Sequence, residues 1–254
     1  MPKQDIYLSV IVPAYNEAER LPKTLRRFQE YFSKQSYPYE ILAVNDGSKD
    51  GTADVVSSME KEIRNLTLVD RKRNMGKGYS VREGMLKAQG KIRLFADADN
   101  ATDISHFDRM RQFFDKGYEV VICSRDPKDA VGATQAVSQP WWKRLLGNLG
   151  NLYIQYMAVR GIWDTQCGFK AFRDFATAKI FSKAKVNRWA FDVEALAIAR
   201  LLDYKIGIIP ANWINDPNTR VSFMSYFKTL WEVYKIKRYL KKFKWQLHQN
   251  DEIA

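Results

Sequence analysis

Cysteine and histidine are scarce in this chain of 254 residues, which has two of each. Cys123 and Cys167 both stand in apolar surroundings, which excludes a disulfide framework, argues against a zinc site and favours a reducing compartment. His106 and His248 lie far apart and have no partner for a metal pair or a catalytic triad, so we expect both on the solvated surface. Chemistry in this protein must therefore rest on carboxylates.

The chain also lacks a long apolar run. The longest uncharged helical stretch, 145–159, contains Gly, Asn and Gln and is shorter than the roughly 20 apolar residues that a membrane span needs. Residues 1–5 begin no long apolar signal region, because the apolar run after them is short and ends at Pro13. We therefore predict neither a signal peptide nor a membrane span.

Positive charge is in excess, with 41 Lys and Arg against 29 Asp and Glu and a net charge of +12. This excess suits an anionic partner such as a nucleotide, a nucleic acid or an acidic membrane surface, and does not choose among them. Hydrophobic residues make up 46% of the chain, which is ample for a core. The simplest prediction is one domain over 1–222 followed by a C-terminal helix over 223–254.

Apolar runs of strand length alternate with helix-like patterns through the first half of the chain. The predicted strands are 7–12, 41–44, 66–69, 92–96 and 120–123. The predicted helices between them are 21–32, 52–63, 77–88 and 104–114. This order predicts an α/β fold with a doubly wound, mostly parallel sheet and helices on both faces. A short segment at 168–173, a helix at 191–202 and a strand at 206–209 follow.

Two carboxylates, Asp97 and Asp99, come directly after the predicted strand 92–96. Ligands of such a sheet collect at the carboxyl ends of its strands. At a strand end, residues two apart point to the same side, so both carboxylates can address one divalent cation. The alternative is a helix cap and a turn, although Thr102 and Asp103 already offer caps for the next helix. The residues of the neighbouring loops are needed to choose between a metal site and a helix cap with a turn.

Two further loops carry polar residues at predicted strand ends. Asp46 is positioned to accept hydrogen bonds from a base or ribose, or it belongs to a plain loop in which Ser48 or Asp50 caps the next helix. Lys77 stands between two glycines at a helix start, where an anion or nucleotide can approach the backbone closely. The loop matches neither the dinucleotide-binding nor the P-loop pattern. Both loops leave the functional and the structural interpretation open.

A second acidic pair, Asp192 and Glu194, opens the predicted helix 191–202 among aromatic and apolar residues. Carboxylates in a first helical turn are ordinarily explained by the helix dipole. An acid in apolar surroundings nevertheless needs a reason to be buried. The residues alone leave a catalytic role and a helix-stabilising role equally open.

Two helices in the second half are predicted to be amphipathic. Over about 141–157, aromatic and leucine residues recur at spacings of three and four, opposite small and polar residues. The tail helix, about 225–247, carries basic residues from Lys228 to Lys244 against one acid, Glu232. Such helices suit an anionic membrane surface, or they pack on the domain with a solvated basic face. An oligomer interface is a further use for them.

The motifs together resemble the inverting family 2 glycosyltransferases with the GT-A fold. SVIVPAYNE (9–17), NDGSKDGT (45–52), NMGKG (74–78) and ADAD (96–99) follow in the order of that family. DTQCGFKAF (164–172) and RWAFDVE (188–194) are similar to the dolichyl-phosphate beta-glucosyltransferase branch more than to the mannosyl branch. The resemblance spans 6–221 and implies a GT-A sheet with amphipathic C-terminal helices.

The resemblance implies roles for individual residues. The residues implied around the nucleotide sugar are Pro13, Tyr15, Glu17, Asp46, Lys77, Asp97, Ala98, Asp99 and Arg125. Asp97 and Asp99 are implied to bind the diphosphate and a Mg2+ or Mn2+ ion, with Asp99 as the closer ligand. Asp192 occupies the position of the catalytic carboxylate. The metal shell is expected to lean on diphosphate oxygens and water, because Ala101 stands where some mannosyl relatives have a Gln ligand.

Acceptor residues follow from the same resemblance. Asp164, Gln166 and Gly168 are implied to border the sugar and the acceptor, and Arg125 and Arg220 are candidates for the phosphates. The acceptor is expected to be a polyprenyl (dolichyl) phosphate, whose second pKa of about 6 leaves it largely deprotonated near neutral pH. We therefore expect Asp192 to orient the acceptor or the metal shell, or to act as a weak base.

The expected reaction is the inverting transfer of a hexose, with UDP-glucose favoured as donor, at the cytoplasmic face of a membrane. We expect no N-terminal anchor of the kind that the eukaryotic glucosyl relatives carry, and we expect peripheral docking through the amphipathic helices instead. The alternatives are a GDP-mannose-dependent mannosyltransferase and a soluble family 2 enzyme with a saccharide acceptor. A nucleic-acid-binding protein is a remote alternative, because no binding motif is present and strand-end carboxylates repel phosphates.

Overall fold

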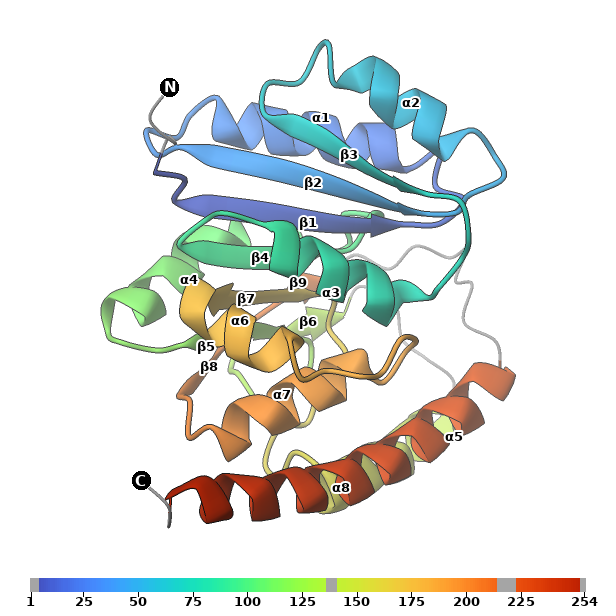
Figure 1. Ribbon diagram of the computed structural model, residues 1–254. Coiled ribbons are helices and arrows are strands. Elements are labelled where there is room, and N and C mark those ends of the chain that lie inside the picture. The colour runs from blue at the N-terminus through green and yellow to red at the C-terminus, as the bar shows by residue number, and fades with distance from the viewer. Residues whose placement is uncertain (1–4, 136–140, 214–222, 252–254) are drawn as a thin grey trace.

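The computed structural model describes residues 5–135, 141–213 and 223–251 (Figure 1). Its centre is a seven-stranded sheet in the order β3-β2-β1-β4-β7-β5-β8. The strands are β1 (Leu8–Ala14), β2 (Tyr39–Asp46), β3 (Leu66–Arg71), β4 (Ile92–Ala96), β5 (Val120–Ser124), β7 (Phe169–Arg173) and β8 (Ile206–Pro210). Neighbours pair in parallel except where β7 lies antiparallel between β4 and β5. The predicted mostly parallel sheet is confirmed.

Helices cover both faces of this sheet, as predicted. The helices are α1 (Leu21–Phe32), α2 (Thr52–Met59), α3 (Lys77–Lys87), α4 (His106–Asp115), α6 (Asp174–Phe181) and α7 (Phe191–Leu201). One buried apolar cluster joins the sheet to α1, α2 and α4, and a second joins it to α3, α6 and α7. Strands buried on both faces read as continuous apolar runs, which is why β1 and β5 are buried along their whole length.

The antiparallel strand β7 decides what lies next to the carboxyl end of β4. Ala96, the last residue of β4, pairs with Phe169, the first residue of β7. The loops that follow β4 and precede β7 therefore meet, and the Asp97 N–H donates to the Gly168 carbonyl at 3.1 Å. The sequence predicted only a short segment at 168–173 and did not predict helix α6 after it.

Two long helices lie beside one another at one end of the molecule (Figure 1). They are α5 (Trp141–Met157), at the predicted position, and α8 (Phe223–Asp251), which contains the predicted 225–247. Helix α8 buries Val233, Ile236 and Leu240 in the cluster of α7. A short parallel pair, β6 (Thr134–Gln135) and β9 (Asn212–Trp213), was not predicted.

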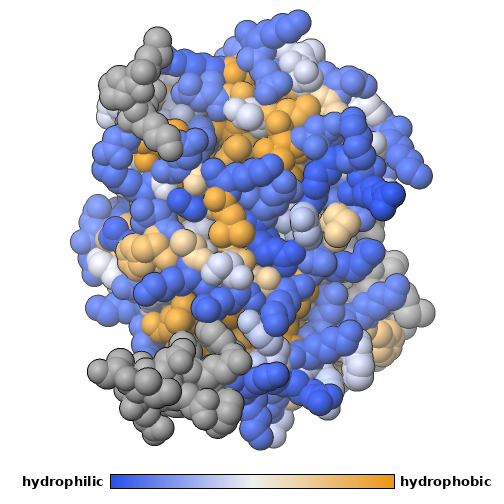
Figure 2. Space-filling view, in the orientation of Figure 1, coloured by the Kyte–Doolittle hydropathy of each residue, from blue (hydrophilic) through white to orange (hydrophobic). Residues whose placement is uncertain are grey.

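The surface in the view of Figure 2 is mainly hydrophilic, with hydrophobic residues emerging in separate areas between charged side chains. Among the described residues, no helix combines the length and the apolar composition required to cross a bilayer. Helices α5 and α8 do expose large apolar side chains, which are Leu149, Leu152, Tyr156, Phe227, Trp231 and Tyr234.

The expectation that both histidines lie on the surface is wrong for His106. Its ring is buried, with Nδ1 2.9 Å from the Asp103 carbonyl and Nε2 accepting the Asn212 N–H at 3.1 Å. These two bonds satisfy a neutral imidazole, so burial costs little and lowers the pKa of His106. The His248 side chain lies outside the described part of the chain.

Candidate active site

The polar loops that follow β1, β2, β3 and β4 are joined to one another by direct contacts. The Asn16 N–H donates to Ser48 Oγ at 2.9 Å, which links the loops after β1 and β2. The Met75 N–H donates to Asp46 Oδ1 at 2.8 Å, which links the loops after β2 and β3. The sheet thus brings the predicted nucleotide residues to one edge.

The carboxylate of Asp46 is buried and hydrogen-bonded to several groups of the chain. Its carboxylate accepts the N–H groups of Met75 and Gly76, each at 2.8 Å, and a guanidinium N–H of Arg71 at 2.6 Å. Gly76 has a φ of +100°, and an added Cβ would fall 2.4 Å from the Asn187 carbonyl oxygen. Asp46 therefore fixes the loop that ends at Lys77, and its contact with a base or ribose stays a prediction.

Lys77 joins this loop to the carboxylate pair after β4. Its ammonium lies 2.6 Å from Asp97 Oδ1. Burial disfavours the charged form, but Asp97 and Asp192 outweigh this effect and raise the pKa of Lys77. Burial and the adjacent charge of Asp97 raise the pKa of Asp99, whose Oδ1 accepts the Ala101 N–H at 3.0 Å. A cation beside Asp97 and Asp99 relieves this repulsion.

The carboxylate of Asp97 occupies the space that a side chain at position 168 would need. A Cβ added to Gly168 would lie 2.1 Å from Asp97 Oδ2 and 2.2 Å from its Cγ. The Ala98 carbonyl accepts the Thr24 hydroxyl at 2.6 Å, which fixes the same loop from helix α1. The glycine in DTQCGFKAF thus permits the close approach of the two loops.

These residues fit a hard divalent cation of the Mg2+ or Mn2+ kind. Carboxylate oxygens are suitable ligands, and Mg2+ commonly takes one or two of them together with phosphate oxygens and water. No group of three or more His, Cys, Asp or Glu able to hold a metal occurs within the described ranges. Ala101 adds no ligand, so Asp97 and Asp99 would leave most positions to a diphosphate and water.

Asp192 is buried beside a lysine that the sequence did not single out. Lys170 is 0% exposed, and its ammonium lies 2.6 Å from Asp192 Oδ1 and also donates to the Cys167 carbonyl. Burial raises the pKa of Asp192, while Lys170 and Lys77 oppose the rise. The signal for Lys170 was a charged residue inside the apolar run FKAF, a position that demands a buried partner.

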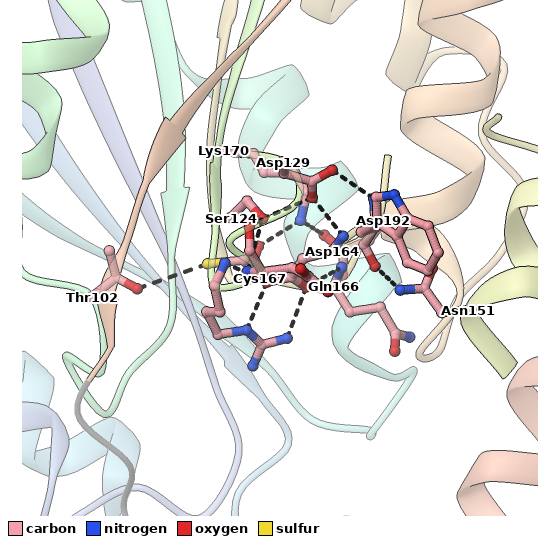
Figure 3. A network of polar contacts seen from close by, with 12 residues as sticks. Thr102, Ser124, Asp129, Asn151, Asp164, Gln166, Cys167, Lys170 and Asp192 are labelled. Carbon is pink, nitrogen blue, oxygen red and sulfur yellow. Dashed lines mark hydrogen bonds and ion pairs between the residues drawn. The ribbon is translucent and has the colours of Figure 1, made fainter. Parts of the chain in front are cut away.

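Asp164, labelled in Figure 3, is buried and forms a second ion pair with Arg125, whose side chain is 24% exposed. The Arg125 Nε and Nη2 donate to the two carboxylate oxygens at 2.7 and 2.9 Å, and its backbone N–H donates at 2.9 Å. Both residues line a cleft of about 200 Å³ with Trp163, Gln166 and residues of α5. The cleft combines one fixed guanidinium with an exposed amide, which suits an anionic oxygen ligand.

Four of the remaining predicted residues stand at or just after the ends of β1 and β4. Pro13 and Ala98 are buried, Tyr15 is exposed, and Glu17 accepts two hydrogen bonds from Arg20. Arg220 lies outside the described ranges. The structure thus joins Asp46, Lys77, Asp97 and Gly168 in one chain of contacts, and it joins Arg125 to Asp164 in another.

The Arg125–Asp164 pair supports a stability prediction. Burial alone would raise the pKa of Asp164, but Arg125 overrides it and lowers the pKa from 3.8 to about 2. Asp164→Asn leaves a partly buried guanidinium without its counter-charge and should cost about 2–3 kcal/mol of unfolding free energy. Because the folded pKa is depressed, the advantage of wild type over the variant is present above about pH 4 and is lost towards pH 2.

Denaturant titrations of both proteins at several pH values measure this difference. Asp174→Asn is a suitable control, because Asp174 starts α6 and its carboxylate accepts the N–H of Phe175 at 2.7 Å. A difference between wild type and Asp164→Asn that does not change below about pH 4 would contradict the assignment of the pKa shift.

Solved structures share this architecture. Staphylococcus aureus TarS 1-349 in complex with UDP-GlcNAc superposes with a TM-score of 0.56 at 18% identity. The match covers 90% of this chain and 65% of the TarS chain, which is less than two thirds of it. Glucosyl-3-phosphoglycerate synthase from Mycobacterium tuberculosis, in complex with Mn2+, UDP and glucosyl-3-phosphoglycerate, superposes with a TM-score of 0.60 at 15% identity, covering 91% and 78% of the two chains. These likenesses confirm the GT-A fold.

Sequence comparison identifies the family to which the chain belongs. A dolichyl-phosphate beta-glucosyltransferase from Dictyostelium discoideum is 36% identical over 251 residues, which cover 94% of this chain and 76% of that protein. Residues 9–181 match the family model described as glycosyl transferase family 2. The resemblance inferred from the motifs is confirmed, and the chain belongs to glycosyl transferase family 2.

Proposed function

We propose that this glycosyltransferase moves glucose from UDP-glucose to a polyprenyl (dolichyl) phosphate, with inversion at the anomeric carbon. The observation that carries the proposal is the junction of Asp97 with Gly168, which sets the carboxylate pair directly beside the DTQCGFKAF segment. The curated relative of 36% identity is named for glucosyl transfer to dolichyl phosphate, and it supports this choice of substrates.

The carboxylate pair supplies the donor side of the reaction. Asp97 and Asp99 would hold the Mg2+ or Mn2+ ion, which supplies charge neutralisation and Lewis acidity at the diphosphate when bound. Lys77 stands beside the same carboxylates and adds a fixed positive charge within reach of the diphosphate. Asp46 keeps the Lys77 loop in position through its bonds to Met75 and Gly76.

The acceptor side uses Arg125, Asp164 and Gln166 around the cleft. A phosphate monoester carries its second charge above about pH 6, so the nucleophilic oxygen needs little help from a base. Asp192 is paired with Lys170, and we assign it an orienting role, because its charge interacts with those of Lys77 and Asp97. If the Asp192→Asn variant transfers sugar at the wild-type rate, Asp192 has no role in catalysis.

Helices α5 and α8 provide the membrane contact in this proposal. They expose aromatic side chains among basic residues, and Lys237 lies 4.5 Å from the centre of the Tyr156 ring, across the two helices. Such a surface attracts anionic lipid and inserts aromatic groups among headgroups. The enzyme would then work as a peripheral protein at the cytoplasmic face.

We expect the double variant Phe227→Ala with Trp231→Ala to bind anionic vesicles about tenfold or more weakly than wild type, because two exposed aromatic groups no longer insert. Wild-type binding should also weaken as salt rises. Vesicle sedimentation measures both effects. Phe175→Ala removes an equally exposed aromatic group from α6 and should leave binding unchanged. Equal binding by all three proteins would contradict membrane docking through α8.

The proposed reaction is tested with radiolabelled UDP-glucose, UDP-GlcNAc and GDP-mannose, each incubated with polyprenyl phosphate or a saccharide acceptor. We expect labelled lipid with UDP-glucose and loss of product when EDTA is added. If labelled lipid forms only with GDP-mannose, the donor is GDP-mannose and not UDP-glucose. If a labelled saccharide forms instead, the acceptor is a saccharide and not a lipid phosphate. No labelled product with any lipid phosphate would refute the proposed function.

A further inference from the structure

Asp129 lies in the loop after β5, outside every motif considered above, and its carboxylate accepts three hydrogen bonds (Figure 3). Oδ1 accepts the Trp163 N–H at 2.8 Å, and Oδ2 accepts the Asp164 N–H at 2.7 Å. Oδ2 also accepts the Ser124 hydroxyl at 2.7 Å. One side chain thus ties the end of β5 to the segment that carries Asp164.

The segment at 163–164 is fixed from several sides. Asn151 of α5 donates its side-chain amide to the Trp163 carbonyl, while Asp129 takes the Trp163 N–H. The Lys128 ammonium lies 3.7 Å from the centre of the Trp163 ring. The peptide between Trp163 and Asp164 is therefore held at its C=O by Asn151 and at its N–H by Asp129 Oδ2, which fixes the position of the Asp164 Cα.

Because Asp164 is fixed in position, it also fixes the guanidinium of Arg125. Its carboxylate holds Nε and Nη2 of the guanidinium, and Trp213 lies on the other side with its ring centre 5.2 Å away. Within the described part of the chain, no hydrogen bond engages Nη1 of Arg125. Arg125 also lines the cleft, so one guanidinium nitrogen is available to a ligand there.

We propose that Asp129 is a positioning residue for the acceptor phosphate: it fixes the backbone of Trp163 and Asp164 and thereby aims the guanidinium of Arg125 into the cleft. This inference rests on the proposed function, in which the cleft receives a phosphate monoester. Asp129 itself touches neither substrate. Its effect passes through Asp164, the residue that holds the fork of Arg125.

Asp129→Asn is the sharpest change, because it keeps the shape of the side chain. An amide oxygen at the Oδ2 position keeps two bonds, but its NH2 group then faces the Trp163 N–H, a donor against a donor. We expect the KM for polyprenyl phosphate to rise about tenfold, with kcat and the KM for the sugar nucleotide within about twofold of wild type. A merely structural role would lower stability and leave the ratio of the two KM values unchanged.

A double-mutant cycle shows whether Asp129 acts through Arg125. Arg125→Lys keeps a counter-charge for Asp164 and removes the fork. In this background, Asp129→Asn should change the KM for polyprenyl phosphate by less than about twofold. Independent, multiplying effects of the two substitutions would overturn the inference.

Asp50→Asn is the matched control, because Asp50 also accepts two backbone N–H groups, from Ala18 and Thr52, and one hydroxyl, from Thr52. It lies after β2, away from the cleft, and its substitution should leave the KM for the lipid phosphate unchanged. An equal rise in KM for both variants would overturn the inference. Wild-type protein that forms no product would instead refute the proposed function, and the inference with it.

Discussion

Asp99→Ala is expected to reduce sugar transfer by about a thousandfold or more, because the variant loses a carboxylate proposed to hold the cation at the leaving diphosphate. The variant should fold, since among the described residues the hydrogen bond that Asp99 accepts is a local one from the Ala101 N–H. Initial rates with and without added Mn2+ measure the effect. Binding of Mn2+ in the presence of UDP, followed by electron paramagnetic resonance, should weaken in parallel.

Asp103→Ala serves as the control for this substitution. Asp103 lies in the same loop, and its carboxylate accepts the Ser105 N–H at 2.9 Å. Its loss should cost about 1 kcal/mol of unfolding free energy and preserve the metal dependence. Activity of Asp99→Ala that remains high and is still abolished by EDTA would refute the assignment of Asp99 as a metal ligand.

Gly168→Ala should reduce kcat/KM for the sugar nucleotide by about a hundredfold, although it adds a single methyl group. That methyl group would lie 2.1 Å from Asp97 Oδ2, so the carboxylate must swing away from its place beside Lys77. The expected damage is a displaced carboxylate in a folded protein. Steady-state kinetics together with a crystal structure of the variant would reveal it.

Gly207→Ala separates this effect from general strain. A Cβ at Gly207 would lie 2.5 Å from the Phe113 ring, which is a similar intrusion at a place remote from the carboxylates. The control should lose stability but keep its kcat/KM once folded. If both variants lost activity in proportion to their stability, the specific role of Gly168 would be disproved.

The regular elements could be predicted because their patterns are local. Helix α1 and strand β4 have the predicted bounds, since periodicity and burial agree throughout both elements. The order of strands in the sheet could not be predicted this way. The insertion of β7 between β4 and β5 depends on contacts between distant segments, and the short run FKAF does not reveal its direction.

The candidate site was predictable where a loop carries its own motif and unpredictable where a partner comes from elsewhere in the chain. Lys77, Asp97 and Gly168 stand in recognisable motifs, and the structure joins them. Lys170 and Asp129 escaped notice because a lone charge usually indicates a solvated face. His106 was misjudged because a single histidine without a metal or triad partner was expected on the surface, whereas the structure supplies a distant partner, the N–H of Asn212.

The antiparallel position of β7 also allows the segment between β5 and β7 to vary in length. Strands β5 and β7 are hydrogen-bonded neighbours, with Ile122 opposite Lys170, so the long excursion between them leaves and returns at one place on the sheet. A loop whose ends are already joined can change length at little entropic cost, roughly 0.6 kcal/mol for each doubling. The excursion can therefore change in length near its tip while the register of β4 and β7, beside the carboxylate pair, is kept.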